Sequence, residues 1–453
     1  MTLTEEYARF TARLEWSDLP AAPRDLALEL FADWFANAAA GLDFPMGRAL
    51  LELTAAAPGP RPALVVGTLQ PAEPLAAALI NAAAAHSLEF DDSYRTGLFH
   101  PGAPIISAAF AAAGRAEAPG RLLLTAMVAG YEVSLRLAEA VNPAHYQVWH
   151  TTGTVGVFGA AAAAARVLGL NPELTAGALG LAGTQAGGLW EVLPRTPLAK
   201  NLHPAKAAQS GLLAALLAEK GIKGPATILE GPRGFFSATV PAEVSPEQCL
   251  TGLGREWWTL KTTIKAYPVC GHAMTPLEAA LSLSGRVEAS EIEEIEVRAH
   301  PVSIRVAGQA KPEDEYQAKF SIPYCVAVAL LEGRVGQEEF APRVRESPRV
   351  IDLLSRIILV PDEELSDRPD RRPARVTVRL ANGRTISSLA EVRRGDPEKP
   401  LTRADKKEKF LALAGGVWGR EAAARLYDAI GDLPQTDNVA AWGERCRELL
   451  GRR

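Results

Sequence analysis

Apolar residues recur every three or four positions between residues 24 and 265, the spacing that places them on one face of an α-helix. The pattern predicts helices at 23–42, 72–90, 118–141, 154–170 and 204–222, each ending near Gly or Pro. Residues 154–168 are apolar on nearly every side, which is typical of a helix buried inside a large bundle. We therefore expect this part of the chain to be all-α.

The pattern changes after Lys265. Apolar and polar residues alternate at 289–307 and 374–395, as in half-buried strands, and the second segment contains Ala-Asn-Gly-Arg, typical of a two-residue hairpin. Helical spacing returns at 314–335, 347–357 and 403–430.

These patterns predict the domain organisation. A chain of 453 residues exceeds one ordinary core. We predict a mainly α protein: 1–265 plus 401–453 form a large all-α domain, and 266–400 form a smaller inserted α+β domain. A tail that forms a separate third domain is the less economical alternative.

Composition excludes several classes of protein. The net charge of -5 gives no general attraction to nucleic acid or an anionic membrane. We expect no membrane span and no signal peptide, and hence a cytoplasmic protein. The four cysteines form no CxxC pair, and nucleotide-binding, zincin and hydrolase motifs are missing, so we expect neither a metal nor an organic cofactor.

The stretch HSLEFDDSYRTGLFHPGAP at 86–104 gathers acids and histidines between two alanine-rich helical segments. One interpretation is a magnesium–diphosphate motif of the isoprenoid type, but no second acidic cluster accompanies it. Another is helix capping by carboxylates paired with Arg95. A third is one wall of a site for acid–base chemistry.

The histidines favour the third interpretation. An isolated histidine is usually structural, but four of the seven precede or open predicted helices, where free N–H groups favour anions: His100, His150, His203 and His272. Lys200 and Lys206 add positive charge beside His203, and Arg233 is a further candidate carboxylate ligand. Imidazoles exchange protons near neutral pH, so the pattern predicts acid–base chemistry on a small polycarboxylate.

Five motifs in order resemble the MmgE/PrpD family, which includes 2-methylcitrate dehydratase, cis-aconitate decarboxylase and iminodisuccinate epimerase. They are HSLEFDDSYRTGLFHPGAPIISAA, HTTGTVGVFGAAAAAARVLGL, KNLHPAKAAQSGLLAALLAEKGIKGPATILEGPRGFF, KAYPVCGH and AKFSIPYCVAVALLEG. The resemblance covers nearly the whole chain. It implies a large helical domain, a smaller α+β lid, a homodimer and a cofactor-independent site in the cleft between the domains.

The resemblance also implies site residues. Those expected in catalysis are Asp91 or Asp92, His100, His150, Lys200, His272 and Tyr324. From the residues themselves we also expect Glu89, Ser93, His203, Lys206 and Arg233 to bind substrate. The family's first motif usually reads Leu-Asp-Phe-Asp-Asp-Thr and many relatives carry His where this chain has Tyr94, so Glu89, Ser93 and Tyr94 are departures that bear on the substrate.

We therefore predict a lyase that acts on a small di- or tricarboxylate, in the first place a 2-methylcitrate dehydratase-like hydro-lyase. His150 or His100 would remove the proton next to a carboxylate, and His272 or Tyr324 would protonate the leaving hydroxyl. Decarboxylation and epimerisation are alternatives, since all three reactions pass through a stabilised carbanion or enolate. A helical protein that binds carboxylates without turnover is the remote alternative.

Overall fold

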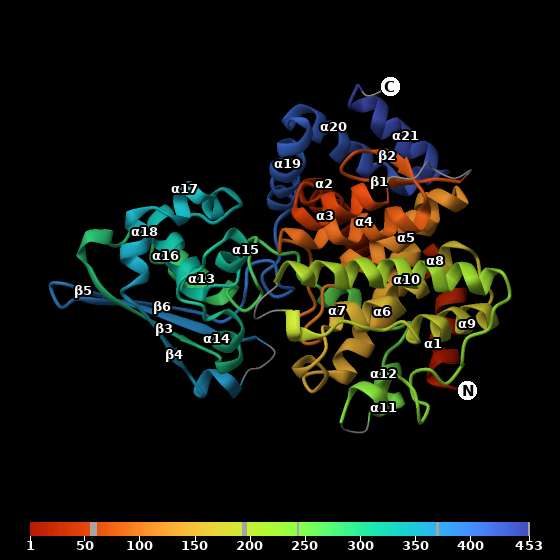
Figure 1. The fold of residues 1–453 in the computed structure, drawn as a ribbon, viewed down its shortest axis with the longest axis horizontal. Coiled ribbons are helices and arrows are strands. Elements are labelled where there is room, and N and C mark those ends of the chain that lie inside the picture. Colours follow the sequence, from red (N-terminus) through yellow and green to blue (C-terminus); the bar gives the residue numbers. More distant parts are fainter. Residues whose placement is uncertain (55–60, 193–196, 242–243, 368–370, 452–453) are drawn as a thin grey trace. The chain divides into compact units, whose positions relative to one another are not determined.

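The computed structural model describes residues 1–54, 61–192, 197–241, 244–367 and 371–451. The chain divides into two compact units, which we call the helical unit (Met1–Ile264 with Thr402–Arg453) and the mixed unit (Lys265–Leu401). Figure 1 shows that the described residues are mainly helical and that the four-stranded sheet belongs to the mixed unit. None of the helices among the described residues is long and apolar enough to cross a membrane.

The helical unit is built from α-helices of both chain segments and one short antiparallel hairpin. The hairpin pairs β1 (Ala63–Val65) with β2 (Gln70–Ala72). The helices are α1 (Leu3–Arg13), α2 (Ala21–Gly41), α3 (Pro45–Leu53), α4 (Pro74–Ser87), α5 (Gly102–Ala116), α6 (Gly120–Val141), α7 (Thr151–Thr154), α8 (Gly156–Val167), α9 (Pro172–Gly183), α10 (Leu202–Glu219), α11 (Phe235–Thr239), α12 (Pro246–Leu250), α19 (Arg403–Trp418), α20 (Arg420–Gly431) and α21 (Val439–Leu449).

Helix α8 lies at the centre of this unit and is buried along its whole length, as its sequence predicts. It packs against α5, α6 and α10, and small side chains allow the close approach. A Cβ atom on Gly211 of α10 would lie 2.5 Å from the Cβ of Ala160, so only glycine fits there. The alanines thus set the distances between the helices that carry the candidate site.

The C-terminal helices pack on the N-terminal segment of the same unit. The ring centroids of Phe31 in α2 and Trp442 in α21 are 5.9 Å apart, and those of Phe35 and Phe410 in α19 are 6.4 Å apart. Gly419, at φ 84°, separates α19 from α20 where the sequence predicted a continuous helical segment.

The mixed unit contains a four-stranded sheet in the order β4-β3-β5-β6, in which β3 and β4 are parallel and the other pairs antiparallel. The strands are β3 (Ile292–Ala299), β4 (Ile357–Pro361), β5 (Ala374–Leu380) and β6 (Thr385–Ala390). The helices are α13 (Met274–Leu281), α14 (Pro301–Ala307), α15 (Glu315–Lys319), α16 (Ile322–Glu332), α17 (Pro342–Arg345) and α18 (Pro348–Leu354). Side chains of α13, α16 and α18 form one core with β3 and β5.

Three local predictions in the mixed unit are corrected. The strand expected at 289–307 ends at Ala299, because Pro301 opens α14 and the His300 side chain caps it. The hairpin loop after Leu380 has three residues instead of two, with Gly383 at φ 82°. The helix expected at 314–335 is broken after Lys319, and Ser321 caps its second half.

Candidate active site

The acidic stretch begins where α4 ends. Leu88 caps the helix, and Glu89 then adopts a left-handed conformation at φ 55°, which a non-glycine residue rarely takes without a functional or structural reason. Helix α19 supports the turn: the Lys409 ammonium donates to the Phe90 carbonyl at 2.7 Å and pairs with Asp33 at 2.6 Å. The loop is therefore held from the C-terminal segment of the chain.

Asp91 lies between two histidines. Its Oδ2 is 2.7 Å from Nδ1 of His86, and its Oδ1 is 3.3 Å from Nδ1 of His100. Burial alone would raise the pKa of Asp91, but the charges and hydrogen bonds of the two imidazoles outweigh it and lower the pKa well below the ordinary range. Asp91 is thus a buried carboxylate that stays ionised.

Asp92 is the neighbour of Asp91 in sequence but has a different environment. It accepts hydrogen bonds from the Tyr131 hydroxyl at 2.8 Å and from the Gly102 N–H at 2.9 Å. Burial and the negative charge of Asp91 raise its pKa to about 8, so it carries a proton at pH 7. A Cβ on Gly102 would lie 2.4 Å from Asp92 Oδ1, so glycine is required at the start of α5.

Lys200 brings a positive charge to the same loop. It lies in the 3₁₀ helix η4 (Pro197–Asn201), is buried, and donates a hydrogen bond to the carboxylate of Glu89. The next residue, Asn201, donates to the Ser87 hydroxyl at 3.3 Å. The segment before α10 is thus attached to the end of α4 by an ion pair and a hydrogen bond.

A second histidine pair completes the cluster. His150 caps α7, and its Nδ1 lies 3.0 Å from Nδ1 of His203 in the first turn of α10. Because one of these nitrogens must donate and the other accept, the two neutral rings have opposite tautomers. The indole of Trp190 covers His150, with ring centroids 4.4 Å apart.

Both rings of this pair favour the neutral state. Burial, then the charge of Lys200, lowers the pKa of His203 to about 4. Burial, then Lys200 and the neighbouring imidazoles, lowers the pKa of His150 well below its ordinary value. At neutral pH the pair therefore offers one hydrogen-bond donor and one acceptor rather than a positive charge.

The two histidine groups are adjacent. The ring centroids of His86 and His100 are 4.8 Å apart, and those of His86 and His150 are 5.9 Å apart. Thr152 of α7 accepts a hydrogen bond from the His100 backbone N–H at 3.2 Å. Of the residues expected at the site, those that the helical unit gathers here are Glu89, Asp91, Asp92, His100, His150, Lys200 and His203.

Three expected residues of this unit point elsewhere or interact only through the backbone. Lys206 is exposed and bonds to Gln209 at 2.7 Å, and Arg233 is exposed in the loop before α11. Ser93 is buried, but its backbone pairs with Thr263. Their binding roles stay predictions that these contacts do not support.

His272 and Tyr324 lie in the mixed unit. Nδ1 of His272 is 3.2 Å from the Ser303 hydroxyl and 3.4 Å from the Arg372 guanidinium. Burial, then Arg372 and other cationic groups, lowers its pKa well below the ordinary value. The Tyr324 hydroxyl donates to the Glu339 carbonyl at 2.6 Å, a bond that must break before it can serve as an acid.

The sequence analysis did not single out three residues that contact the cluster: His86, Tyr131 and Trp190. His86 is fully buried in the last turn of α4, five positions before Asp91. This five-residue spacing across the end of α4 was the sequence feature that could have indicated the contact between His86 and Asp91. Tyr131 and Trp190 lie in other segments and carried no signal of their own.

The same three groups are candidate metal ligands. Within the described part of the chain, His86, Asp91 and His100 offer ligand atoms that all lie within 4.8 Å of one another. However, the 2.7 Å separation between His86 and Asp91 is that of a direct hydrogen bond, and a metal ion would have to displace it. The contacts as they stand describe a hydrogen-bonded array.

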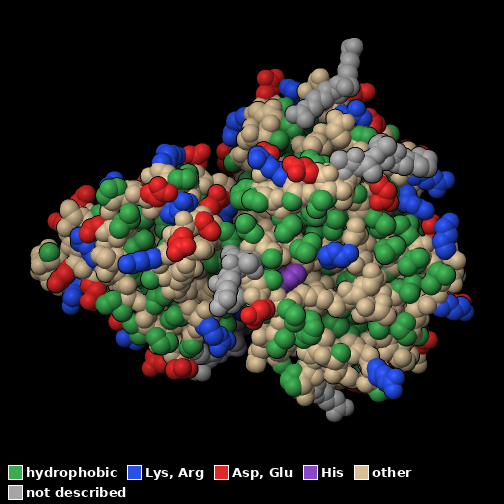
Figure 2. All heavy atoms as spheres, viewed as in Figure 1, with side chains coloured by type: hydrophobic (Ala, Val, Ile, Leu, Met, Phe, Trp, Pro, Cys, Tyr) green, Lys and Arg blue, Asp and Glu red, His purple; other side chains and the backbone are tan. Residues whose placement is uncertain are grey.

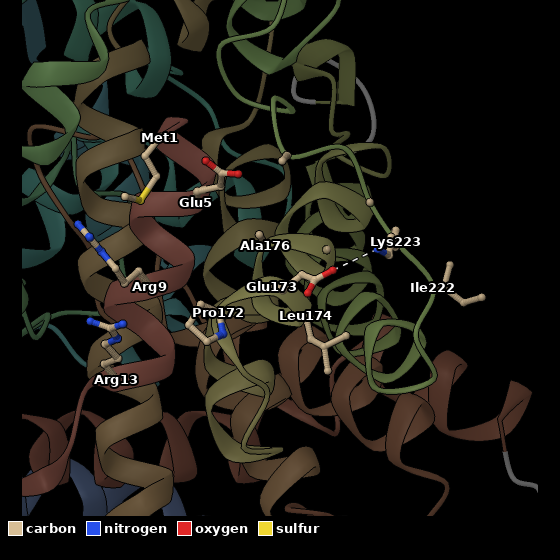
Figure 3. A pocket seen from close by; sticks show the side chains of 13 residues that line it. Met1, Glu5, Arg9, Arg13, Pro172, Glu173, Leu174, Ala176, Ile222 and Lys223 are labelled. Atoms are coloured by element: carbon tan, nitrogen blue, oxygen red, sulfur yellow. Dashed lines mark hydrogen bonds and ion pairs between the residues drawn. The ribbon is translucent and has the colours of Figure 1, made fainter.

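The helical unit also has an open pocket of about 490 Å³ on another part of its surface. Residues of α1, α9 and the segment before Ala226 line it, and no histidine is among them (Figure 3). Its Glu173–Lys223 ion pair, at 3.1 Å, is exposed to solvent. On the face drawn in Figure 2, positively and negatively charged side chains are likewise exposed and mixed with one another. The grouping of buried titratable residues therefore singles out the histidine cluster.

Comparisons with known proteins agree with the motifs. The MmgE/PrpD N-terminal domain matches residues 5–247, and the MmgE/PrpD C-terminal domain matches residues 267–433. The cis-aconitate decarboxylase-like protein oryM of Aspergillus oryzae is 27% identical over 97% of this chain and 96% of its own length.

Two further relatives carry more specific names. A cis-aconitate decarboxylase of Aspergillus terreus is 26% identical over 97% of this chain and 94% of its own length. A 2-methylcitrate dehydratase of Cupriavidus necator is 26% identical over 73% of this chain and 72% of its own length. Together with the two domain matches, which span most of the sequence, these relatives show that the chain belongs to the MmgE/PrpD family.

Proposed function

We propose that this protein is a cofactor-independent lyase acting on a small di- or tricarboxylate. One observation carries the proposal: ionised Asp91, a buried lysine and four imidazoles, two buried and two partly buried, lie together in the helical unit. Imidazoles beside an ionised carboxylate and a lysine suit proton transfer next to a substrate carboxylate.

His100 is the proposed proton-transfer group. Its side chain is 16% exposed, whereas those of His86 and Asp91 are 0% and 3% exposed, so it is the member of the array that a substrate can reach. Its Nδ1 lies 3.3 Å from Asp91 Oδ1, so we assign the exchange of a proton with carbon to Nε2. Lys200 and His203 would face a substrate carboxylate, with Glu89 fixing the position of the lysine.

The first candidate reaction is decarboxylation of a cis-aconitate-like tricarboxylate. The relatives that align over nearly the whole chain have this activity in their names. Carbon dioxide would leave, its bonding electrons would remain on the substrate as a carbanion, and His100 in its protonated form would deliver a proton to that carbon.

Dehydration of a 2-methylcitrate-like hydroxy acid is the second candidate, supported by the dehydratase relative. Neutral His100 would remove the proton next to a carboxylate. A second group, acting as an acid, would donate a proton to the hydroxyl, which leaves as water. Each reaction needs one group that delivers a proton to a substrate carbon or removes a proton from it, so the cluster is compatible with both.

The test is incubation of the purified protein with cis-aconitate and, separately, 2-methylcitrate in D₂O, followed by NMR. Decarboxylation would give a dicarboxylate with deuterium at one carbon; dehydration would give an unsaturated acid and water. A folded protein that neither converts these acids nor exchanges their protons would contradict the proposal. Activity retained after treatment with EDTA is expected.

A further inference from the structure

Trp190 has a buried indole N–H that has no acceptor among the described residues. An indole nitrogen can only donate, and a buried donor without an acceptor is costly. Two other buried indoles of the helical unit avoid this cost by donating to an oxygen, at 3.0 Å from Trp34 and at 2.9 Å from Trp442. The unsatisfied N–H of Trp190 therefore needs an explanation.

The backbone before Trp190 holds this side chain against the second histidine pair. The Trp190 backbone N–H donates to the Val148 carbonyl at 3.0 Å. In the other direction, the His150 backbone N–H donates to the Gly188 carbonyl at 2.9 Å. Gly188 also lies against His203, since a Cβ there would be 3.2 Å from Cγ of that ring. One short segment thus places its indole on one ring of the pair and its backbone on the other.

The indole is also close to a fixed positive charge. Trp190 opens the 3₁₀ helix η3 (Trp190–Val192), which packs against η4, the 3₁₀ helix that contains Lys200. After burial, which contributes most, the charge of Lys200 lowers the pKa of both His150 and His203, so it acts on both rings of the pair. An acceptor that reaches the indole here meets a positive charge as well, which favours an anionic oxygen over a neutral one.

We propose that Trp190 is a substrate-binding residue whose indole N–H donates to a carboxylate of the substrate. The inference rests on the proposed function, which brings a small polycarboxylate to the histidine cluster. Covering His150 needs only an aromatic ring, and phenylalanine would provide one without an unsatisfied donor. The N–H favours substrates with a carboxylate at this position, because a substrate with an apolar group there leaves the buried donor unpaired.

An unsatisfied indole N–H is not enough by itself to identify a ligand site. The N–H groups of Trp258 and Trp418 are also buried without an acceptor among the described residues. The Trp258 ring lies against a cation, with the Lys261 ammonium 3.7 Å from its centroid. The Trp418 ring lies beside Phe35, with centroids 6.1 Å apart. The location of Trp190 in the histidine cluster therefore carries the assignment, and Trp418 provides a control with the same chemical group elsewhere.

The direct test follows the indole N–H signals by NMR in protein with isotopically labelled tryptophan. The probe is tricarballylate, a saturated tricarboxylate that has neither a hydroxyl to lose nor a double bond. The signal that disappears in Trp190→Phe is assigned to Trp190. We expect this signal to move downfield as tricarballylate saturates the protein, because a hydrogen bond to an anion deshields the proton, whereas the Trp418 signal should stay in place. Sodium chloride at the same ionic strength should move neither signal.

Kinetics on the acid that the wild type converts provide a second readout. Trp190→Phe keeps an aromatic ring over His150 and removes the donor. We expect KM to rise about tenfold with kcat nearly unchanged, as for the loss of a hydrogen bond to a charged group that is present in both the ground state and the transition state. Trp418→Phe, the matched control, should leave both constants at their wild-type values. Trp190→Tyr provides the signal assignment if the phenylalanine variant does not fold.

A Trp190 signal that stays in place at saturating tricarballylate would overturn the inference, as would a wild-type KM in folded Trp190→Phe. Failure of tricarballylate to bind at millimolar concentration would also contradict it. The titration needs no turnover. A shifted Trp190 signal without conversion of any tested acid would therefore support the binding role while contradicting the proposed function, and turnover with an unmoved signal would do the reverse.

Discussion

His86 in the helical unit and His272 in the mixed unit are both buried, but their charged neighbours have opposite signs. In the helical unit, His86 and His100 share the ionised carboxylate of Asp91. In the mixed unit, His272 contacts Ser303 and lies beside the Arg372 guanidinium, and Arg393 and Arg305 add further positive charge. Burial is common to both; the charge of the neighbouring group differs.

The difference shows why burial alone does not identify a proton-transfer residue. A carboxylate next to an imidazole stabilises its protonated form, so a proton can be taken up and released near neutral pH. Arginine next to an imidazole disfavours the protonated form. His272 is therefore poorly suited to hold a proton and to act as a general acid. A neutral His272 suits hydrogen bonding to an anion better than the acid role predicted from its motif.

The largest effect on stability and activity should come from breaking the buried ion pair between Lys200 and Glu89 in the helical unit. Lys200→Met leaves the Glu89 carboxylate buried without its cation, which should destabilise the fold by about 3–5 kcal/mol and lower activity at least about 10²-fold. Urea unfolding and steady-state kinetics measure the two effects. The double variant Lys200→Met with Glu89→Gln should regain stability but not activity; recovery of both would show that Lys200 is purely structural.

The next prediction concerns Asp92 and the pH dependence of the stability of the fold. Its folded pKa of about 8 exceeds the ordinary 3.8, so the unfolded chain releases this proton first and wild-type stability falls as pH rises from about 4 to 8. Asp92→Asn cannot ionise, so its stability relative to the wild type should increase over that interval. Urea unfolding at several pH values measures it; a constant difference would mean that Asp92 is not protonated in the folded state.

At His272 we expect a smaller effect, of opposite sign, on the pH dependence of stability. Because its pKa is lowered in the folded state, the unfolded chain takes up the proton first below about pH 6.5, and stability is lost as pH falls, by at most about 1.4 kcal/mol per pH unit. His272→Asn can keep the bond to Ser303 and should reduce this acid sensitivity. If both proteins lost stability in parallel on acidification, the cationic environment assigned to His272 would be wrong.

Hydrophobic spacing was sufficient to predict the α-helical character and the main helices, because long periodic segments such as 154–170 carry a strong signal. It failed where a single residue decides the local structure, as at Pro301, which converts the end of a predicted strand into α14. Helix boundaries near Ser321 and Gly419 depended in the same way on caps and left-handed residues.

For the candidate site, the sequence indicated which loops carry chemistry but not which side chains face inward. Lys206 lies one helical turn after His203 yet is exposed. His86 resembled an ordinary helix residue, since only the fold shows that the chain after α4 turns Asp91 back onto it. The difference between Asp91 and Asp92 depends on tertiary partners that a sequence does not name.

The most direct test of the account is a side-by-side measurement of kcat/KM for Asp91→Asn and Asp92→Asn at pH 7 on whichever acid the wild type converts. The two changes are chemically identical and adjacent. Asparagine imitates the protonated Asp92 but removes the charge of Asp91, so we predict near wild-type kcat/KM for Asp92→Asn and a loss of about 10²-fold or more for Asp91→Asn. Equal losses, or a larger loss at position 92, would contradict the account.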